Sequence, residues 1–232
     1  IHASEVYDKA RQNLDTFRQK GCLVREEAPA YYIYELIMQG RSQTGLVAVS
    51  SVDDYENDLI KKHELTRPEK EQDRINHIKT TGAQTGNVFL AYRDVPAMNE
   101  LVETIQTRPP MYDFTAADGI THRIWRVDLP EETGAITRLF GEEVPATYIA
   151  DGHHRAASAA KVRRALGAGH HPHANYFLTT LFPASQLHIM DYNRVVKDLN
   201  GLTAESFLRS LYEDFDVERM PYAFSPTQPH EF

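Results

Sequence analysis

Apolar positions recur along the chain with two periods, one typical of helices and one typical of strands. Apolar residues at spacings of three and four predict a helix over 4–20, with Ser4 as its cap. The aromatic and β-branched runs 31–38 and 45–49 predict two strands, and the polar residues 39–44 predict the hairpin loop between them. The pattern thus indicates a helix that packs onto the sheet that follows it.

The remaining periodic segments indicate that strands and helices alternate irregularly. Further strands are predicted over 88–92, 121–127, 146–150, 175–182 and 187–190. Further helices are predicted over 96–106, 130–140 and 203–212. Irregular alternation favours an α+β fold, with a mixed sheet flanked by helices. No internal repeat is visible, and the linker-like stretch 167–173 is too short to divide the chain, so we expect a single domain over 1–232.

Composition narrows the classes of protein to consider. The net charge of −8 argues against broad attachment to nucleic acid or to anionic lipid. No apolar run is long enough to cross a membrane, so no membrane partner is expected. The single Cys22 cannot form an internal disulfide, which favours the reduced cytoplasm. The chain starts without Met and ends after a proline-rich stretch, so we expect a fragment of a longer chain.

Polar residues gather where a predicted strand gives way to a predicted helix. Asp151-Gly152-His153-His154-Arg155 follows the apolar run that ends at Ala150 and precedes an alanine-rich run. The first amides of a helix lack partners inside the helix and carry the positive end of its dipole. A glycine-containing turn into a helix is therefore a natural seat for phosphate.

A second charged segment, residues 61–74, is almost wholly polar. Thr66 and Glu69 fit a capping box and Pro68 fits the first turn, so a helix is predicted to start near Thr66. One face of that helix carries basic side chains: Lys70, Arg74 and His77. The segment is interpreted either as a solvated helix with Glu and Lys pairs or as a surface that reaches an anion.

Several other chemistries find little support in the chain. Neighbouring histidines on a helix point in different directions, so no metal ligands are assigned to His153 and His154. There is no Gly-x-Ser-x-Gly turn and no Walker-type loop. Cys22 has no basic surroundings, and we expect it to be buried and inert.

Four runs resemble, in order and spacing, the uncharacterised bacterial and archaeal family DUF1015, and the resemblance covers nearly the whole chain. They are Ile60 to Arg74, Val88 to Tyr92, Ile149 to Arg155 and Tyr192 to Val196. The Asp-Gly-His-His-Arg segment is also similar to the phosphate-binding motif of the ParB/sulfiredoxin-like superfamily. This resemblance implies a ParB/sulfiredoxin-like core.

Members of that superfamily include partition proteins that bind CTP, sulfiredoxins that use ATP, and free-serine kinases. Sulfiredoxins carry a catalytic Cys where this chain has His, and no DNA-binding helix-turn-helix is found here, so no nucleic-acid partner is expected. The resemblance then implies a nucleotide-dependent kinase of a small hydroxyl metabolite such as serine, with Mg²⁺ and ATP or ADP. A non-catalytic nucleotide-binding switch and, behind it, a ParB-like nuclease are the alternatives.

The kinase interpretation assigns roles to named residues. Glu64 is the first candidate for the catalytic base, with Glu71 and Asp73 behind it, although the base could lie in a region N-terminal to this chain. The candidates for phosphate and nucleotide binding are Asp151, Gly152, His153, His154, Arg155, His63, Arg67, Lys70, Arg74, Asn193 and Arg194.

Overall fold

The computed structural model describes residues 3–167, 169–190 and 195–222. Their contacts group into two units, residues 1–187 and residues 188–232. The first unit contains the sheet, and the described residues of the second contain one helix. The expectation of one domain over the whole chain stays a prediction.

The first unit alternates strands and helices as follows. Its helices are α1 (Ser4–Gln19), α2 (Val52–Glu56), α3 (Pro68–Thr81), α4 (Pro96–Gln106), α5 (Pro130–Glu143) and α6 (His153–Leu166), with 3-10 turns η1 (Pro172–Asn175) and η2 (Ala184–Gln186). Its strands are β1 (Tyr31–Met38), β2 (Arg41–Ser51), β3 (Ile60–Lys61), β4 (Val88–Tyr92), β5 (Tyr112–Thr115), β6 (Thr121–Val127), β7 (Thr147–Asp151) and β8 (Tyr176–Pro183). The second unit contains α7 (Ala204–Asp214).

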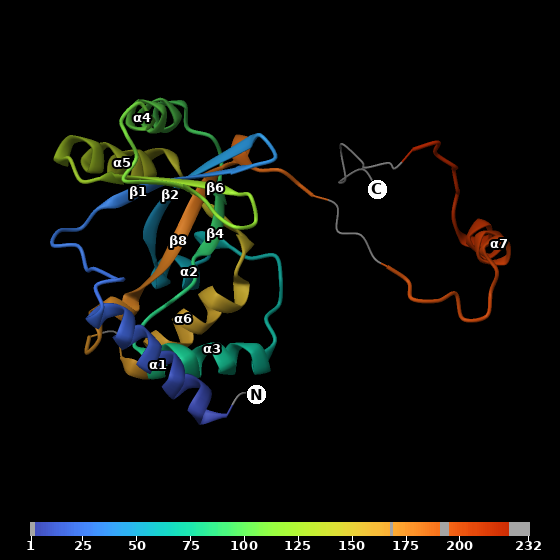
Figure 1. The fold of residues 1–232 in the computed structure, drawn as a ribbon, viewed down its shortest axis with the longest axis horizontal. Helices are drawn as coiled ribbons and strands as arrows, with labels where there is room; N and C mark the ends of the chain where they lie inside the picture. Colours follow the sequence, from blue (N-terminus) through green and yellow to red (C-terminus); the bar gives the residue numbers. More distant parts are fainter. Residues whose placement is uncertain (1–2, 168, 191–194, 223–232) are drawn as a thin grey trace. The chain divides into compact units, whose positions relative to one another are not determined.

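The strands form one eight-stranded mixed sheet in the order β3-β7-β4-β8-β2-β1-β6-β5. The pairs β3–β7 and β4–β8 are parallel and the other pairs are antiparallel. Helices α4 and α5 lie together at one end of the first unit, and α1, α3 and α6 lie together at the other (Figure 1). The predicted α+β class with a mixed sheet is confirmed.

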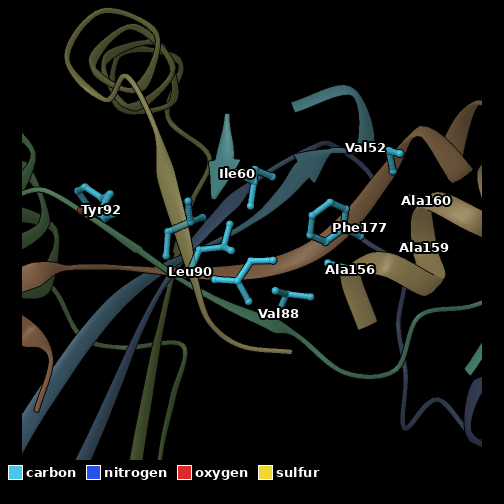
Figure 2. Packing of buried hydrophobic residues seen from close by; sticks show 11 residues of the cluster. Val52, Ile60, Val88, Leu90, Tyr92, Ala156, Ala159, Ala160 and Phe177 are labelled. Carbon is cyan, nitrogen blue, oxygen red and sulfur yellow. The ribbon is translucent and has the colours of Figure 1, made fainter. Parts of the chain in front are cut away.

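One core forms between α6 and the strands at its side of the sheet. Burial alternates along β4, so that Val88 and Leu90 point inward with the fully buried Phe177 of β8 (Figure 2). The alanines of α6, including Ala156 and Ala160, are buried against these side chains. Small side chains allow the helix to approach the sheet closely, which fixes where its first turn lies.

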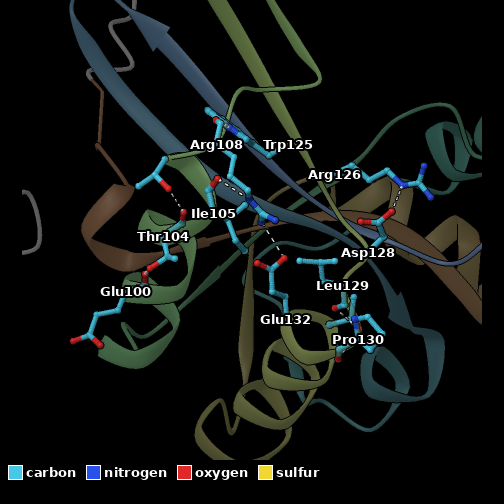
Figure 3. A network of polar contacts seen from close by, with 12 residues as sticks. Glu100, Thr104, Ile105, Arg108, Trp125, Arg126, Asp128, Leu129, Pro130 and Glu132 are labelled. Atoms are coloured by element: carbon cyan, nitrogen blue, oxygen red, sulfur yellow. Dashed lines mark hydrogen bonds and ion pairs between the residues drawn. The ribbon is translucent and has the colours of Figure 1, made fainter.

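A second core forms under α4 and α5, around Ile33, Trp125 and Ile136. The indole N–H of Trp125 donates to the carbonyl oxygen of Arg108 at 2.7 Å, and the Arg108 guanidinium pairs with Glu132 at 2.9 Å (Figure 3). These bonds satisfy the polar groups at the border of an otherwise apolar cluster.

The hairpin between β1 and β2 is tighter than expected. Residues 39–44 were predicted as its loop, but β2 begins at Arg41 and only Gln39 and Gly40 form the turn. Both have positive φ, 52° and 80°, the conformation that two-residue hairpin turns require. The polar side chains of residues 41–44 lie on a regular strand, so their polarity misled the prediction.

Two other expectations near the ends of elements were wrong. Residues 187–190 form no strand, because β8 ends in the turn η2, where Asp94 accepts a hydrogen bond from the Ser185 amide at 3.0 Å. Ser4 is the first residue of α1, whose N-cap is Ala3. The helix predicted over 203–212 is confirmed as α7, which begins with a capping box at Thr203.

Cys22 was expected to be buried but is exposed. It lies in the segment after α1, and α1 packs chiefly on α3 and not on the sheet. The prediction failed because this segment lies beyond the packed part of α1. Within the described residues, no helix is long and apolar enough to cross a membrane.

Candidate functional site

Three neighbouring strands have one end each on the same side of the sheet, and these strand ends together position a cleft. Strand β3 is parallel to β7, and β4 is antiparallel to β7. The segment after β3, the C-terminal end of β7 and the segment before β4 therefore meet at that edge. The first carries Glu64, the second ends at Asp151, and the third carries Gly86.

Gly152 makes the predicted passage from strand to helix. It is the N-cap of α6 in a left-handed conformation, with φ 103° and ψ 26°. Its carbonyl oxygen accepts from the amides of Arg155 and Ala156, at 2.9 and 3.0 Å. The amides of His153 and His154, in the first turn, have no acceptor within the helix. The expected helix N-terminus is present at this junction.

Arg155 fits against two glycines. A Cβ atom on Gly152 would lie 2.9 Å from the Arg155 Nε atom, and one on Gly86 would lie 3.4 Å from Nη1. The guanidinium forms an ion pair with the carboxylate of Asp151. Glycine at both positions therefore leaves the space in which the Arg155 side chain lies.

A cleft of about 720 Å³ opens at this junction. Its walls come from Glu64, from the α3 residues Glu69, Lys70, Asp73, Arg74, His77 and Ile78, from the loop residues Gln84, Thr85 and Gly86, and from residues 151–155. The predicted basic face of the charged segment thus faces the predicted helix terminus. On this wall Lys70, Asp73 and Arg74 were predicted as site residues, and His77 as part of the basic face. Glu69, Ile78 and Gln84 to Gly86 were missed as site residues.

The cleft contains charges of both signs. Lys70 and Arg74 are exposed, and neither forms an ion pair with another described residue. Arg155 is already paired with Asp151. The other carboxylates of the cleft belong to Glu64, Glu69 and Asp73. Two exposed cations beside a helix N-terminus suit an anion, and the carboxylates suit a cation or ammonium group that accompanies it.

The two histidines of α6 hold the segment that leads into α3. The Nε2 atom of His153 accepts from the backbone amide of His63 at 3.4 Å, and the Nε2 atom of His154 accepts from that of Arg67 at 3.1 Å. An accepting Nε2 leaves the proton of a neutral imidazole on Nδ1. Neither His63 nor Arg67 lines the cleft, and their backbone amides bond the two histidines that do.

His153 also faces the carboxylate of Glu64. The His153 side chain is 4% exposed, and its Nδ1 lies 3.5 Å from Oε2 of Glu64, whose side chain is 57% exposed. The His63 ring contacts the His153 ring edge-on, with centroids 4.4 Å apart. Burial and then the charge of His63 lower the pKa of His153, and the carboxylates of Glu64 and Asp151 oppose this only in part. The imidazole is therefore held neutral.

Glu71 is a buried structural residue outside the cleft. Its carboxylate accepts hydrogen bonds from the Thr66 hydroxyl and the Lys161 ammonium, and its carbonyl oxygen accepts from Ser158 at 3.3 Å. Burial acts to raise the pKa of Glu71, but the bonds from Lys161 and Thr66 outweigh it and the net pKa is lowered.

The structure does not contain the capping box that was predicted at the start of α3. The Thr66 hydroxyl bonds Glu71 instead of a backbone amide, and the N-cap is Arg67, whose side chain makes no capping bond. Pro68 in the first turn is confirmed. The helix starts at Pro68, near the predicted position, but the Thr66 hydroxyl bonds the buried Glu71 and does not cap the helix.

Asp73 lies on the cleft wall but also anchors α1. The buried Tyr7 of α1 donates its hydroxyl proton to Asp73 Oδ1 at 2.7 Å. This hydrogen bond raises the pKa of Tyr7. Asn193 and Arg194, the remaining predicted binding residues, lie outside the described residues.

Two carboxylates of the cleft fit the smaller ligand set that Mg²⁺ uses beside phosphate oxygens. Within the described part of the chain, no three His, Cys, Asp or Glu side chains are grouped so as to hold a metal ion. Mg²⁺ in nucleotide sites commonly needs just one or two carboxylates beside phosphate oxygens and water. Glu69 and Asp73, one turn apart on the cleft face of α3, fit that smaller requirement.

The fold and the site define an α+β protein whose sheet edge carries a cleft at a helix N-terminus, walled by cations and carboxylates. The chain belongs to the family described as "Protein of unknown function (DUF1015)", whose model matches residues 1–232. The predicted membership is thereby confirmed. No curated protein and no solved structure shows significant similarity to the chain.

Proposed function

We propose that the cleft binds the phosphates of a nucleotide and that the protein transfers a phosphoryl group to a small hydroxyl metabolite. The observation that carries this proposal is the convergence of Lys70 and Arg74 of α3 on the N-terminus of α6. Phosphoryl transfer depends mostly on positioning and on neutralising the charge of the phosphates. A helix terminus with cations on the facing wall supplies both.

Each group of the cleft has a role in this proposal. The first amides of α6 and the guanidinium of Arg155 contact one phosphate, and Lys70 and Arg74 contact the next. Glu64 accepts the proton of the acceptor hydroxyl, because it lines the cleft and its side chain is more than half exposed. Asp73 also lines the cleft, but it accepts the hydrogen bond of Tyr7. Glu71 is excluded from this role by its burial with Lys161.

Bound Mg²⁺ would neutralise charge on the phosphates, held by Glu69 and Asp73 together with phosphate oxygens. The mixed charge of the walls also favours an acceptor that carries both an ammonium and a carboxylate. Serine has these groups and a hydroxyl, and it remains our first choice of acceptor. We further propose a ParB/sulfiredoxin-like core and a cytoplasmic location.

Product analysis tests the proposal. The protein is incubated with serine, Mg²⁺ and either ATP or ADP, and phosphoserine is measured by mass spectrometry. We expect phosphoserine from the wild type, a loss of at least about a hundredfold with Glu64→Gln, and no loss with Glu143→Gln, an exposed residue at the end of α5. A turnover that survives Glu64→Gln would contradict the assignment of the base.

One observation favours a non-catalytic nucleotide switch as the second candidate. Asp73 accepts the Tyr7 hydroxyl and Glu71 is buried, so two of the three predicted bases have structural partners. A switch predicts nucleotide binding with neither phosphoserine nor another phosphorylated product. Binding without transfer to any small hydroxyl compound would select it over the kinase.

A further inference from the structure

A second pocket adjoins the cleft and has no role in the function proposed above. This adjoining pocket measures about 860 Å³, and its walls include Ile78, Gln84, Val162, Leu166, Tyr176 and Leu178. Ile78 and Gln84 line both the cleft and the adjoining pocket. The two spaces therefore share a border at these two residues.

The border is held in place by hydrogen bonds to β8. The Gln84 Nε2 atom donates to the Tyr176 carbonyl oxygen at 3.1 Å, and Gln84 Oε1 accepts from the Leu178 amide at 3.3 Å. Because both polar atoms of the Gln84 amide bond to β8, this side chain is held in one place between the cleft and the adjoining pocket.

The walls of the adjoining pocket have a different chemistry from those of the cleft. Ile78, Val162 and Leu178 present apolar surface, and the histidine-rich stretch 170–173 contributes imidazole rings. Sites for small ligands typically combine apolar walls with a few polar groups in a volume of roughly 300 to 1,000 Å³. Lys79 is the cation of this wall. Such a space suits a flat, partly apolar group with a few polar contacts.

The separation along α6 matches a nucleotide. His154 lines the cleft and Val162 lines the adjoining pocket, which places them about 12 Å apart along the helix axis at 1.5 Å per residue. That is about the length of an extended nucleoside triphosphate from its terminal phosphate to its base. A serine-sized acceptor is too short to reach across and has no apolar body to bury.

We propose that the adjoining pocket binds the base and ribose of the nucleotide whose phosphates lie in the cleft. This inference rests on the proposed function. It gives the stretch 170–173 a role in the site, as the rim beside which the base lies. The ligand class is a purine or pyrimidine nucleotide, whose phosphates contact the cleft and whose flat base contacts the adjoining pocket.

Calorimetric titrations of the whole chain with three ligands test this inference. ATP, ADP and inorganic tripolyphosphate are compared in the presence of Mg²⁺. We expect ATP to bind at least about tenfold more tightly than tripolyphosphate, because only ATP fills the adjoining pocket. Ala174→Trp, on the pocket wall, should remove this advantage and leave the affinity for tripolyphosphate unchanged.

Matched variants separate the possible outcomes. Ala97→Trp, on an exposed position of α4, should bind ATP like the wild type. Leu178→Thr, which removes apolar wall but suits a strand, should lower the ATP affinity in the same direction as Ala174→Trp. Retained binding of tripolyphosphate shows that each variant is folded.

Equal affinity of the wild type for ATP and tripolyphosphate would overturn the inference while leaving phosphate binding in the cleft intact. Unchanged ATP affinity in both Ala174→Trp and Leu178→Thr, with tripolyphosphate binding retained, would also overturn it, because the adjoining pocket would then not contact the ligand. Failure of the wild type to bind any of the three ligands would instead overturn the proposed function, and the inference with it.

Discussion

At the scale of single residues, Gly152 is a position at which the site tolerates little change. Its φ of 103° is strained for any other residue, and an added Cβ would meet the Arg155 guanidinium at 2.9 Å. The residue thus couples the backbone turn to the place of the Arg155 side chain.

Gly152→Ala should lower the free energy of unfolding by about 1 to 3 kcal/mol and weaken nucleotide binding, because both the backbone and Arg155 must shift. Urea unfolding and calorimetry measure the two effects. Gly134→Ala, in the middle of α5 with open space around its Cβ, is the matched control and should be neutral or stabilising. Unchanged unfolding of Gly152→Ala would refute the strained turn.

His153 gives a pH dependence with a defined sign. Its pKa is lowered in the folded protein, so its neutral form favours folding. This contribution is complete above the unfolded pKa of about 6.5 and is lost as the pH falls through the lower folded value. The titratable groups that face it are His63, Glu64, Asp151 and His154.

We expect the wild type to lose more stability than His153→Gln between pH 7.5 and pH 5, as measured by chemical unfolding. An NMR titration should also place the midpoint of the His153 ring below 6.5. A midpoint above 6.5 would show that the carboxylate of Glu64 outweighs burial, which contradicts the neutral imidazole described above.

At the scale of elements, the packing of α3 against α6 sets the width of the cleft. Glu71 of α3 contacts Lys161 and Ser158 of α6, and the amide of Arg67 bonds His154. These contacts join segments that are about ninety positions apart in sequence. The packing of α3 on α6 therefore positions the two walls of the cleft relative to each other.

Glu71→Gln should destabilise the protein by about 1 to 2 kcal/mol at pH 7, a modest value because the Lys161 partner is half exposed. The lowered pKa of Glu71 means that its contribution is present above the unfolded pKa of about 4.3 and is lost as the pH falls below it. The difference between wild type and variant in urea unfolding should therefore shrink below pH 4.3. Glu69→Gln, at an exposed position of the same helix, is the control and should unfold like the wild type at pH 7 and below pH 4.3. A stability difference between wild type and Glu71→Gln that does not change with pH would contradict the ionised pair of Glu71 and Lys161.

The elements that the sequence predicts well are those with several periods of apolar alternation. Strand β4 and helices α4 and α5 were expected within a few residues of their observed ends. The short elements α2, β3 and β5 were missed, because two to five residues carry too little periodicity. The apolar run 187–190 was predicted as a strand but finds no partner strand, a fact that only the tertiary structure contains.

The same limit explains which parts of the site were predicted. Gly152 and the basic face of α3 follow from local rules of helix ends and helical spacing. The burial of Glu71 depends on Lys161, and the place of Gly86 depends on Arg155, so neither could be recognised from neighbouring residues. The local signal for the loop wall was Gly82, the glycine that caps the C-terminus of α3 and marks the start of this loop.

At the scale of the whole molecule, the sheet brings together three distant segments at one edge. The order β3-β7-β4 places the residues after position 61, before position 88 and at positions 151–155 beside one another. Ligands of α/β sheets commonly lie in such crevices at strand ends. The central claim is that this edge of a DUF1015 protein binds nucleotide phosphates.

Calorimetric titration with ATP and Mg²⁺ of the wild type, Arg155→Ala and Arg164→Ala tests this claim most directly. Arg164 lies on the same helix outside the cleft and pairs with Glu56, so it controls for the loss of a cation. We predict binding by the wild type and by Arg164→Ala, and an affinity lowered at least about tenfold by Arg155→Ala, the value of a charge-assisted contact. Absence of binding by the wild type, or equal binding by all three proteins, would contradict the phosphate site.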